Sequence, residues 1–244
     1  MPPAYTIHVI PYPLPVHSLT PLAEKLRKFK LHALLSDPKA FSQNHATESS
    51  LPISAWETRV ANPDFRIVVC VVADADDRDG AFPSDKNKEA EEEHVVQRLL
   101  ESEWAGTFTL VGPVPLSSWL VPSSGQPQPG AEGAETRWHL TSLFVLPAHR
   151  GCGLASKLTL AAVRAGSSGH QVAGNVGATT RFRLIVHPKN IEVVKLYEKL
   201  GFVKGGLYTQ REAMVAMGDA AGVPEAAAAD IWDSRLAIGM ERLV

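Results

Sequence analysis

The segment that decides the fold reads Leu143-Phe144-Val145-Leu146-Pro147-Ala148-His149-Arg150-Gly151-Cys152-Gly153-Leu154-Ala155. Its first part is a short apolar run, typical of a buried strand, that ends at Pro147. Two glycines then let the backbone come close to a ligand, and the residues after Gly153 are typical of a helix. The first turn of a helix has unpaired N–H groups, and Arg150 adds a positive charge beside them. The segment therefore predicts an anion-binding turn that a diphosphate would fit.

Two other glycine-rich phosphate loops fit this segment poorly. A dinucleotide-binding fingerprint requires a third glycine, and Ser156 stands at that position. A nucleotide-binding P-loop needs Gly-Lys followed by Ser or Thr after a longer loop, which this segment lacks. On these residues alone, the alternative that the turn simply starts a helix and binds no ligand also remains.

Composition and charge limit the classes of protein and partner. The 244 residues carry a formal net charge of -2, so no overall basic field would attract nucleic acid or an anionic membrane. Cys70 and Cys152, the two cysteines, are too few for a disulfide framework or a thiolate zinc site. No apolar run approaches the roughly 20 residues of a membrane helix, and residues 1–15 lack the pattern of a secretory signal. We expect a soluble cytoplasmic protein with no metal, nucleic-acid or membrane partner; a homodimer stays open.

Strands and helices can be predicted from the spacing of apolar residues. Alternating and β-branched runs predict strands at residues 6–12, 65–73, 104–113, 138–145, 181–187, 203–210 and 234–244. Steps of three and four predict a helix capped by Thr20 with Pro21 at its first position, a short helix at 56–60, and a helix after the glycine turn. A further helix at 191–200 is expected between an Asn190 cap and Gly201. This order predicts an α/β chain with a mixed sheet and helices on both faces.

Two long segments are interpreted as insertions into a single domain that spans residues 1–244. Residues 74–103 are dense in charge and are predicted to be a partly helical or mobile insertion that supplies no core. An acidic docking surface, which would make the chain an adaptor, is the alternative to a solvated face. Residues 117–135 are rich in Pro, Gly and Ser and are predicted to be a connection with no packing potential.

Two motifs resemble those of the GCN5-related N-acetyltransferases. Arg150-x-x-Gly153-x-Ala155 resembles the family's Q/R-x-x-G-x-G/A signature, whose strand-turn-helix holds the pyrophosphate of acetyl-CoA. The second segment, residues 190–202, resembles the family's N-x-x-A-x-x-L-Y-E-K-L-G-F pattern, with Val194 near the alanine and Tyr197 at the tyrosine. The motifs occur in the family's order, and the similarity covers most of the chain outside the insertions. Residues 37–41 resemble a group of fungal-type members.

The resemblance implies a fold, a cosubstrate and a set of contacts. The fold would be one domain around a central mixed, mostly antiparallel twisted sheet of about six to seven strands. The cosubstrate would be acetyl-CoA, with no metal. The residues implied to contact it are Leu143, Phe144, Val145, Arg150, Gly151, Cys152, Gly153, Leu154, Ala155, Ser156, Asn190 and Tyr197.

Acetyl transfer to an amine requires a base, a stabilised oxyanion and an acid for the leaving thiolate. The backbone amides of residues 143–145 are the candidates for the thioester oxygen. Tyr197 is the candidate acid, since a phenol near pKa 10 can protonate a thiolate near 8.5; a tyrosine packed in the core is the alternative. His139 stands where histone-acetylating members have a glutamate, so His139 or water is the candidate base, and a structural strand histidine is the alternative.

Three further inferences concern the acceptor and the cysteine. The histidine in place of glutamate weakens any inference that the chain modifies histones. Glu48 lies in the segment that borders the acceptor site in the family and would suit a cationic acceptor. Cys152 is interpreted as a small residue between two glycines.

These observations predict an acetyl-CoA-dependent N-acetyltransferase that uses direct transfer through a ternary complex. The expected acceptor is a small primary amine. The alternatives are a protein acetyltransferase acting on an N-terminus or a lysine, and a non-catalytic acyl-CoA-binding regulatory module.

Overall fold

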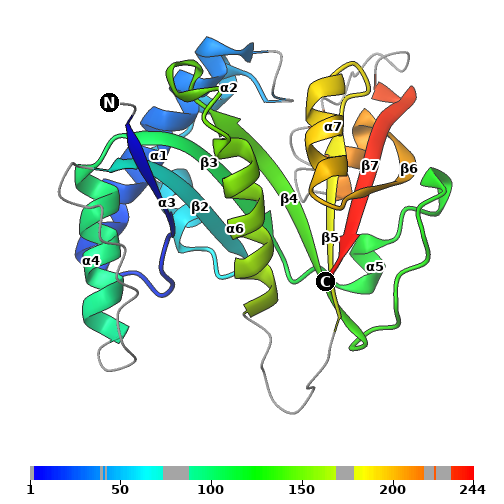
Figure 1. Cartoon of the computed structure of the whole chain (residues 1–244), viewed down its shortest axis with the longest axis horizontal. Helices are drawn as coiled ribbons and strands as arrows, with labels where there is room; N and C mark the ends of the chain where they lie inside the picture. The colour runs from blue at the N-terminus through cyan, green and yellow to red at the C-terminus, as the bar shows by residue number, and fades with distance from the viewer. Residues whose placement is uncertain are drawn as a thin grey trace. The chain divides into compact units, whose positions relative to one another are not determined.

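The computed structural model describes residues 3–38, 41, 43–73, 88–168, 179–216, 223 and 232–244. Within these residues a sheet of seven strands has the order β1-β2-β3-β4-β5-β7-β6 (Figure 1). The strands are β1 (Ala4–Val9), β2 (Phe65–Ala73), β3 (Trp104–Val111), β4 (Glu135–Val145), β5 (Thr179–Val186), β6 (Val203–Thr209) and β7 (Arg235–Leu243). β4 pairs with β5 in parallel, whereas β1 with β2, β5 with β7 and β6 with β7 are antiparallel. The predicted mixed, mostly antiparallel sheet is confirmed.

Helices flank this sheet. They are α1 (Val16–Ser36), α2 (His45–Ser50), α3 (Ile53–Ala61), α4 (Lys88–Glu101), α5 (Leu116–Trp119), α6 (Leu154–Ser168), α7 (Ile191–Lys199) and α8 (Gln210–Ala216), with short 3-10 turns η2 (Pro122–Ser124) and η3 (Pro147–His149). No helix in the described ranges has the length and apolar character needed to cross a membrane.

Helix α1 begins one turn earlier than the sequence predicts. Pro15 is its N-cap residue, and Pro21 lies inside the helix rather than at its first position. Pro21 cannot donate to the carbonyl of His17, four residues before it. His17 is exposed, so water can satisfy that carbonyl, and the helix extends back to Val16.

The described chain folds into two compact units. The first consists of Met1–Thr109 and Ser142–Ala162, and the second of Leu110–Thr141 and Val163–Val244. The chain therefore passes between the units within β3, within β4 and within α6. The single domain over residues 1–244 stays a prediction.

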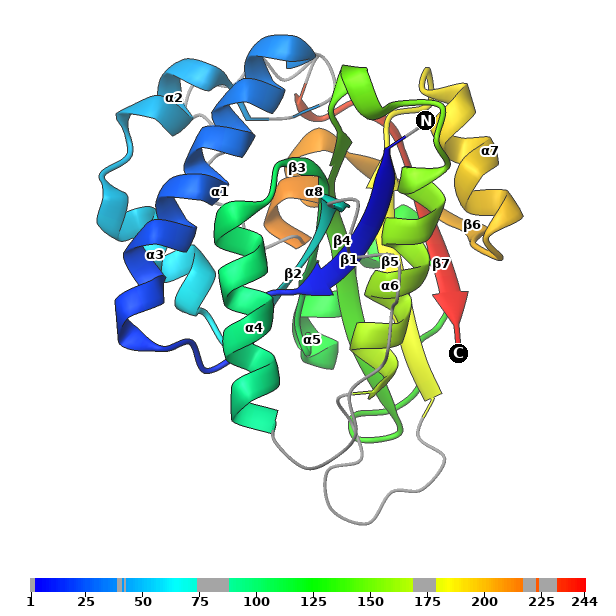
Figure 2. The same ribbon diagram turned by 60° about the vertical axis from the view of Figure 1, so that its left-hand side comes forward.

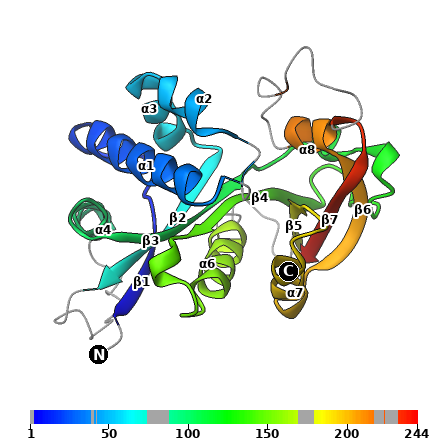
Figure 3. The same cartoon turned by 90° about the horizontal axis from the view of Figure 1, so that it is seen from above.

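In the first unit, helices cover both faces of β1, β2 and β3. Figure 2 shows α1, α2 and α3 together on one side of β1 and β2, and Figure 3 shows α6 on the other. The core between α1, α3 and the sheet holds Leu22, Phe29, Trp56, Val69 and Trp104, all less than 9% exposed.

Helix α4 also belongs to this core, which corrects the prediction that residues 74–103 supply none. Val96 and Leu99 of α4 are 2% and 0% exposed and lie in the same cluster. The Leu99 carbonyl accepts a hydrogen bond from the Trp104 indole at 2.8 Å. Charged and polar residues occupy the rest of the helix surface, so a narrow apolar stripe is enough to pack the helix against the core. Residues 74–87 of the predicted insertion lie outside the described residues.

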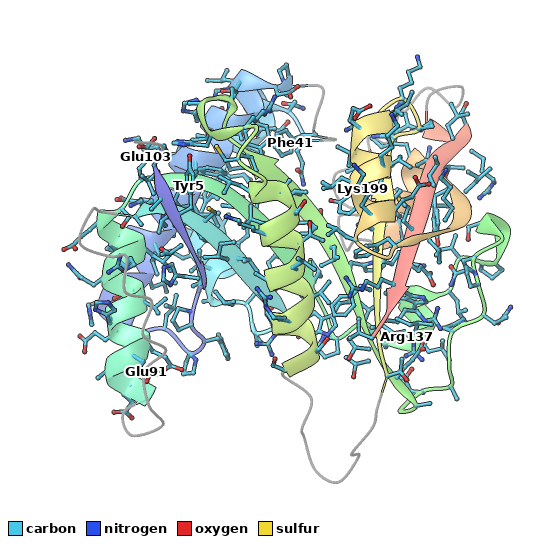
Figure 4. All side chains as sticks on the ribbon, in the orientation of Figure 1. Tyr5, Phe41, Glu91, Glu103, Arg137 and Lys199 are labelled. Atoms are coloured by element: carbon cyan, nitrogen blue, oxygen red, sulfur yellow. The ribbon has the colours of Figure 1, made fainter. Side chains whose placement is uncertain are left out.

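In the second unit, α7 and α8 lie on opposite faces of β5, β7 and β6 (Figure 3). Glu135, Arg181 and Glu241 form a buried ion network with bonds of 2.8 to 3.1 Å. Arg137, which is labelled in Figure 4, joins it through Glu135 at 3.0 Å. Each of these buried charges has an oppositely charged partner, which limits the cost of removing it from water.

The segment that follows β3 is packed, contrary to the prediction that residues 117–135 have no packing potential. Trp119 of α5 is fully buried. Two buried arginines hold the segment: Arg183 donates to the Trp119 carbonyl at 2.9 Å and to Gln126 Oε1 at 3.1 Å. Arg137 donates to the carbonyls of Gly130 and Ala131. The donors come from β4 and β5, far away in sequence, so the local composition gives no sign of them.

Glu212 caps helix α8, and its contacts lower its pKa. The Glu212 N–H donates to Thr209 Oγ1 at 3.0 Å, and the Thr209 N–H donates to the Glu212 carboxylate at 2.9 Å, a reciprocal capping box. Arg235 donates two hydrogen bonds to the same carboxylate, at 2.8 and 2.9 Å. Burial alone would raise the pKa of Glu212, but the hydrogen bonds from Arg235, Ser123 and Thr209 lower it to about 2.

Glu212→Gln should therefore remove clearly more stability at neutral pH than at pH 2.5. The folded pKa lies below the unfolded value of about 4.3, so the contribution is complete above that value and is lost as pH falls toward 2. Because the side chain is 23% exposed, we expect about 2 kcal/mol at pH 7. Urea unfolding at pH 7 and pH 2.5 checks this, with Glu192→Gln, an exposed pair member, as the control. An equal loss at both pH values would contradict the ionic contribution.

Candidate active site

Strand β4 carries the first predicted contact residues, and its pairing with β5 stops part-way. The parallel register runs from Glu135 with Thr179 to His139 with Arg183. Ser142 then has a φ of 59°, in the left-handed region that residues with a Cβ rarely adopt. The end of β4 after Ser142 thus lies outside the register with β5.

The backbone groups of residues 143–145 point to alternate sides of β4. The Leu146 N–H donates to the Ala105 carbonyl of β3 at 2.9 Å. Since successive residues of a strand direct their backbone groups to opposite sides, Phe144 also faces β3. A Cβ added at Gly106 of β3 would lie 2.9 Å from the Phe144 carbonyl oxygen, which agrees with this assignment. Of the three amides expected at a thioester oxygen, those of Leu143 and Val145 face away from β3.

The glycine turn has the geometry of an anion cradle. Gly151 and Gly153 have φ values of 81° and 70°, and a Cβ added at either would meet no atom within 4 Å. Both conformations favour glycine, and the space above the backbone is open. After Arg150, the next described amide with a backbone partner is that of Lys157, which donates to the Gly153 carbonyl at 3.2 Å. The amides of residues 151–156 at the N-terminal end of α6 therefore fit a diphosphate.

The Arg150 side chain lies against neighbours from two other elements. Its Nε donates to the Val145 carbonyl at 3.1 Å, and its Nη2 is 3.2 Å from an Asp37 carboxylate oxygen. The guanidinium carbon lies 5.3 Å from the centre of the Phe144 ring. The positive charge predicted beside the turn is present, and Asp37 partly neutralises it.

Three residues that the sequence does not predict lie beside the turn. The Tyr5 hydroxyl is 3.1 Å from His149 Nδ1 and 3.9 Å from Cys152 Sγ. His149 Nε2 is 3.3 Å from a Glu103 oxygen, and Figure 4 shows the side chains of Tyr5 and Glu103 at the same end of this unit. His149 could have been suspected because it precedes Arg150 in the motif. Tyr5 and Glu103 lie far away in sequence and give no local signal.

His139 is enclosed in the second unit. It is 1% exposed, and its ring stacks on Trp119 with centres 4.8 Å apart. Arg183 Nη2 lies 3.2 Å from His139 Nε2, and Arg183 Nε lies 3.5 Å from Nδ1. Burial, together with the charge of Arg183, lowers the pKa of His139 well below its usual value. A guanidinium only donates hydrogen bonds, so the neutral imidazole directs its one lone pair at Arg183.

Tyr197 and Asn190 lie on α7 or at its start. Tyr197 is 4% exposed, and its ring contacts that of Phe202 edge to face at 5.5 Å. Burial raises the pKa of the Tyr197 phenol, so it stays protonated at neutral pH. Asn190 is the N-cap residue, as predicted, but its side chain makes no capping hydrogen bond. Its exposed amide is therefore not used by the helix.

The predicted site residues are divided between the two units. Residues 143–156 belong to the first, and His139, Asn190 and Tyr197 belong to the second. Glu48 forms two hydrogen bonds with Arg59, at 2.6 and 3.1 Å, so its charge is already paired. In the described part of the chain, no cluster of three or more His, Cys, Asp or Glu is arranged to hold a metal ion.

Comparison with known proteins gives a family and a fold. Residues 62–202 match the model of the acetyltransferase (GNAT) family. No curated protein matches the sequence. Among solved structures, Arabidopsis thaliana NAA60 in complex with acetyl-CoA is similar with a TM-score of 0.51 and 14% identity, over 99% of both chains.

Two further solved structures are similar in fold. A GNAT-family acetyltransferase from Streptococcus pneumoniae has a TM-score of 0.54 and 13% identity, over 99% of this chain and 100% of that one. Mutant forms of the spermidine/spermine N-acetyltransferase SpeG from Vibrio cholerae have a TM-score of 0.51 and 13% identity, over 98% and 93%.

Proposed function

We propose, from the premise that this chain belongs to the acetyltransferase (GNAT) family, that it moves an acetyl group to a primary amine by direct transfer in a ternary complex. The donor is acetyl-CoA, and the acceptor is a small molecule. The observation that carries the proposal is the turn at residues 151–156, where two open glycines lie in a series of amides that have no backbone partner among the described residues.

The turn and the end of β4 would hold the donor. When bound, acetyl-CoA supplies an activated acetyl thioester and a negatively charged diphosphate. The amides of residues 151–156 and the positive end of α6 would bind the diphosphate. The amides of Leu143 and Val145, which face away from β3, would donate to the pantetheine arm and to the oxygen that becomes negative during transfer.

Tyr197 is the proposed general acid. This role rests on the resemblance of residues 190–202 to the family's segment. A phenol that stays protonated can give its proton to a thiolate near pKa 8.5.

Water, rather than His139, is the proposed base. The lone pair of His139 faces Arg183, and its ring is covered by Trp119. A proton taken there would place an imidazolium beside a buried guanidinium, and such like-charge repulsion opposes protonation. His139 would instead orient Arg183 and the segment that Arg183 holds.

The proposed acceptor is a small primary amine in the cytoplasm. The histidine at position 139, where histone-acetylating relatives carry glutamate, favours an acceptor other than histones. The paired charge of Glu48 removes one candidate for attracting a cationic acceptor. The cytoplasmic location is supported by two cysteines that are both free.

A thiol-release screen tests the proposal. The protein is incubated with acetyl-CoA and amines, polyamines, amino acids, aminosugars or peptides, and products are identified by mass spectrometry. Release of CoA with a small amine that gains one acetyl group is the expected result. Acetylation of peptides alone would replace the small acceptor with a protein one. Bound acetyl-CoA with no thiol released by any amine would indicate a non-catalytic module.

A further inference from the structure

Arg150 and Asp37 form an ion pair at the start of the proposed diphosphate turn. Asp37 is the C-cap residue of α1, and its side chain is 37% exposed. Its carboxylate oxygen lies 3.2 Å from Nη2 of Arg150, the residue that directly precedes Gly151. A negative charge therefore stands next to the place where the chain would receive a diphosphate.

This arrangement sets two anions in competition for one guanidinium. An arginine can bind a phosphate through two parallel N–H groups, and such charged hydrogen bonds are stronger than neutral ones. In the structure, Nε of Arg150 donates to the Val145 carbonyl and Nη2 donates to the Asp37 carboxylate. A diphosphate that used Nη2 as one of two parallel donors would have to displace Asp37, and one that bound through Nη1 would share the guanidinium with it. In both cases the carboxylate also repels the diphosphate over a distance shorter than the screening length of about 10 Å at 0.1 M salt.

We infer that Asp37 limits the affinity of this chain for acetyl-CoA and CoA by competing with the diphosphate for Arg150. The inference rests on the proposed function, because it requires the diphosphate to bind at residues 151–156. It assigns to Asp37 a role in tuning donor affinity that no motif in the sequence indicates.

The turn does not depend on the ion pair for its shape. The Arg150 Nε bond to Val145 and the contact with the Phe144 ring do not involve Asp37. On the other side, His149 is bound to Tyr5 and contacts Glu103. An exposed pair such as this one contributes little to stability. The backbone bond from the Asp37 N–H to the Ala33 carbonyl, at 3.0 Å, also survives a change of its side chain.

The consequence for turnover follows from the chemistry of the product. CoA carries the same diphosphate as acetyl-CoA, so Asp37 weakens the binding of both. A weaker hold on CoA speeds its release, a step that limits turnover in many enzymes.

Asp37→Asn is the decisive change. We expect the affinity for CoA, measured by calorimetry at low salt, to rise about fivefold, because a repulsive charge is removed and a guanidinium is released. Arg150→Ala should weaken CoA binding about tenfold. In the Arg150→Ala background, Asp37→Asn should raise the affinity by less than in wild type, about twofold, because only the direct repulsion between the carboxylate and the diphosphate is then removed.

A truncated donor separates the electrostatic role from a structural one. The KM for acetylpantetheine, which lacks the diphosphate, should be the same in wild type and Asp37→Asn. Asp64→Asn is the matched control, since it makes the same change of charge at an exposed position in the same unit. Asp64 also lies far from the turn: Tyr5, which is beside the turn, pairs with Val72 near one end of β2, and Asp64 directly precedes the other end of that strand.

The outcomes distinguish this inference from the proposed function. Tighter CoA binding by Asp37→Asn, with unchanged use of acetylpantetheine, supports the role of Asp37. Unchanged or weaker CoA binding by the variant, while wild type prefers CoA to the truncated compound, overturns the inference and leaves the proposed function intact. A wild-type protein that binds CoA no better than pantetheine overturns the assignment of the turn itself.

Discussion

Tyr197→Phe should lower kcat about a hundredfold, the size of contribution expected of a general acid. The Kd for acetyl-CoA should change by about twofold or less, since only one hydroxyl is lost. The ring contact with Phe202 is retained in phenylalanine, so the packing of α7 should persist.

The pH dependence tests one requirement of this role. Because burial raises the pKa of Tyr197, the proton needed by the departing thiolate stays in place beyond the range where an ordinary phenol ionises, near 10. The wild-type kcat should therefore show no loss from phenol ionisation up to about pH 9.5.

Steady-state kinetics with a saturating amine, together with calorimetry for acetyl-CoA, measure the two effects. Tyr12→Phe makes the same chemical change at a tyrosine that is 53% exposed, and it should leave kcat unchanged. A Tyr197→Phe enzyme with the wild-type kcat would exclude Tyr197 as the acid and leave it as a packing residue.

Trp119→Ala should lower the free energy of unfolding by about 3–5 kcal/mol, the range found for large aromatic side chains removed from a core. Trp119 is fully buried, stacks on His139 and lies 4.0 Å from the Arg183 guanidinium carbon, measured to the ring centre. Removing the indole leaves a cavity, and the buried Arg183 guanidinium loses the ring that covers it.

Urea unfolding followed by circular dichroism measures this loss. Leu120→Ala, at the neighbouring position that is 38% exposed, should cost about 1 kcal/mol or less. A similar small loss for Trp119→Ala would mean that the segment after β3 adds little to the stability of its unit.

The parts of the fold that the sequence predicts are those with a local signal. The strand at residues 65–73 follows from its continuous β-branched run, and β2 has the same bounds. The glycine turn and the helix after it follow from residues adjacent in the chain. The helix closed by Gly201 is also found, and the φ of 81° at that glycine agrees with its predicted place at the helix end.

The parts that the sequence does not predict depend on partners far away in the chain. The apolar stripe of α4 is not recognised in the sequence because most of its residues are charged or polar. Of the residues described in this helix, only Val96 and Leu99 are buried in the core. The segment around Trp119 looks unstructured because the arginines that hold it come from β4 and β5. For the same reason the Arg150 partner Asp37, more than one hundred positions earlier in the chain, could not be found from the motif.

The way the chain alternates between its two units affects how it can be synthesised and divided. The first unit needs residues from both Met1–Thr109 and Ser142–Ala162. During translation the contacts within this unit are therefore incomplete until residue 162 has emerged from the ribosome. No single cut of the gene yields either unit whole, so fragments made by truncation should be taken up by chaperones or proteases rather than accumulate as folded halves.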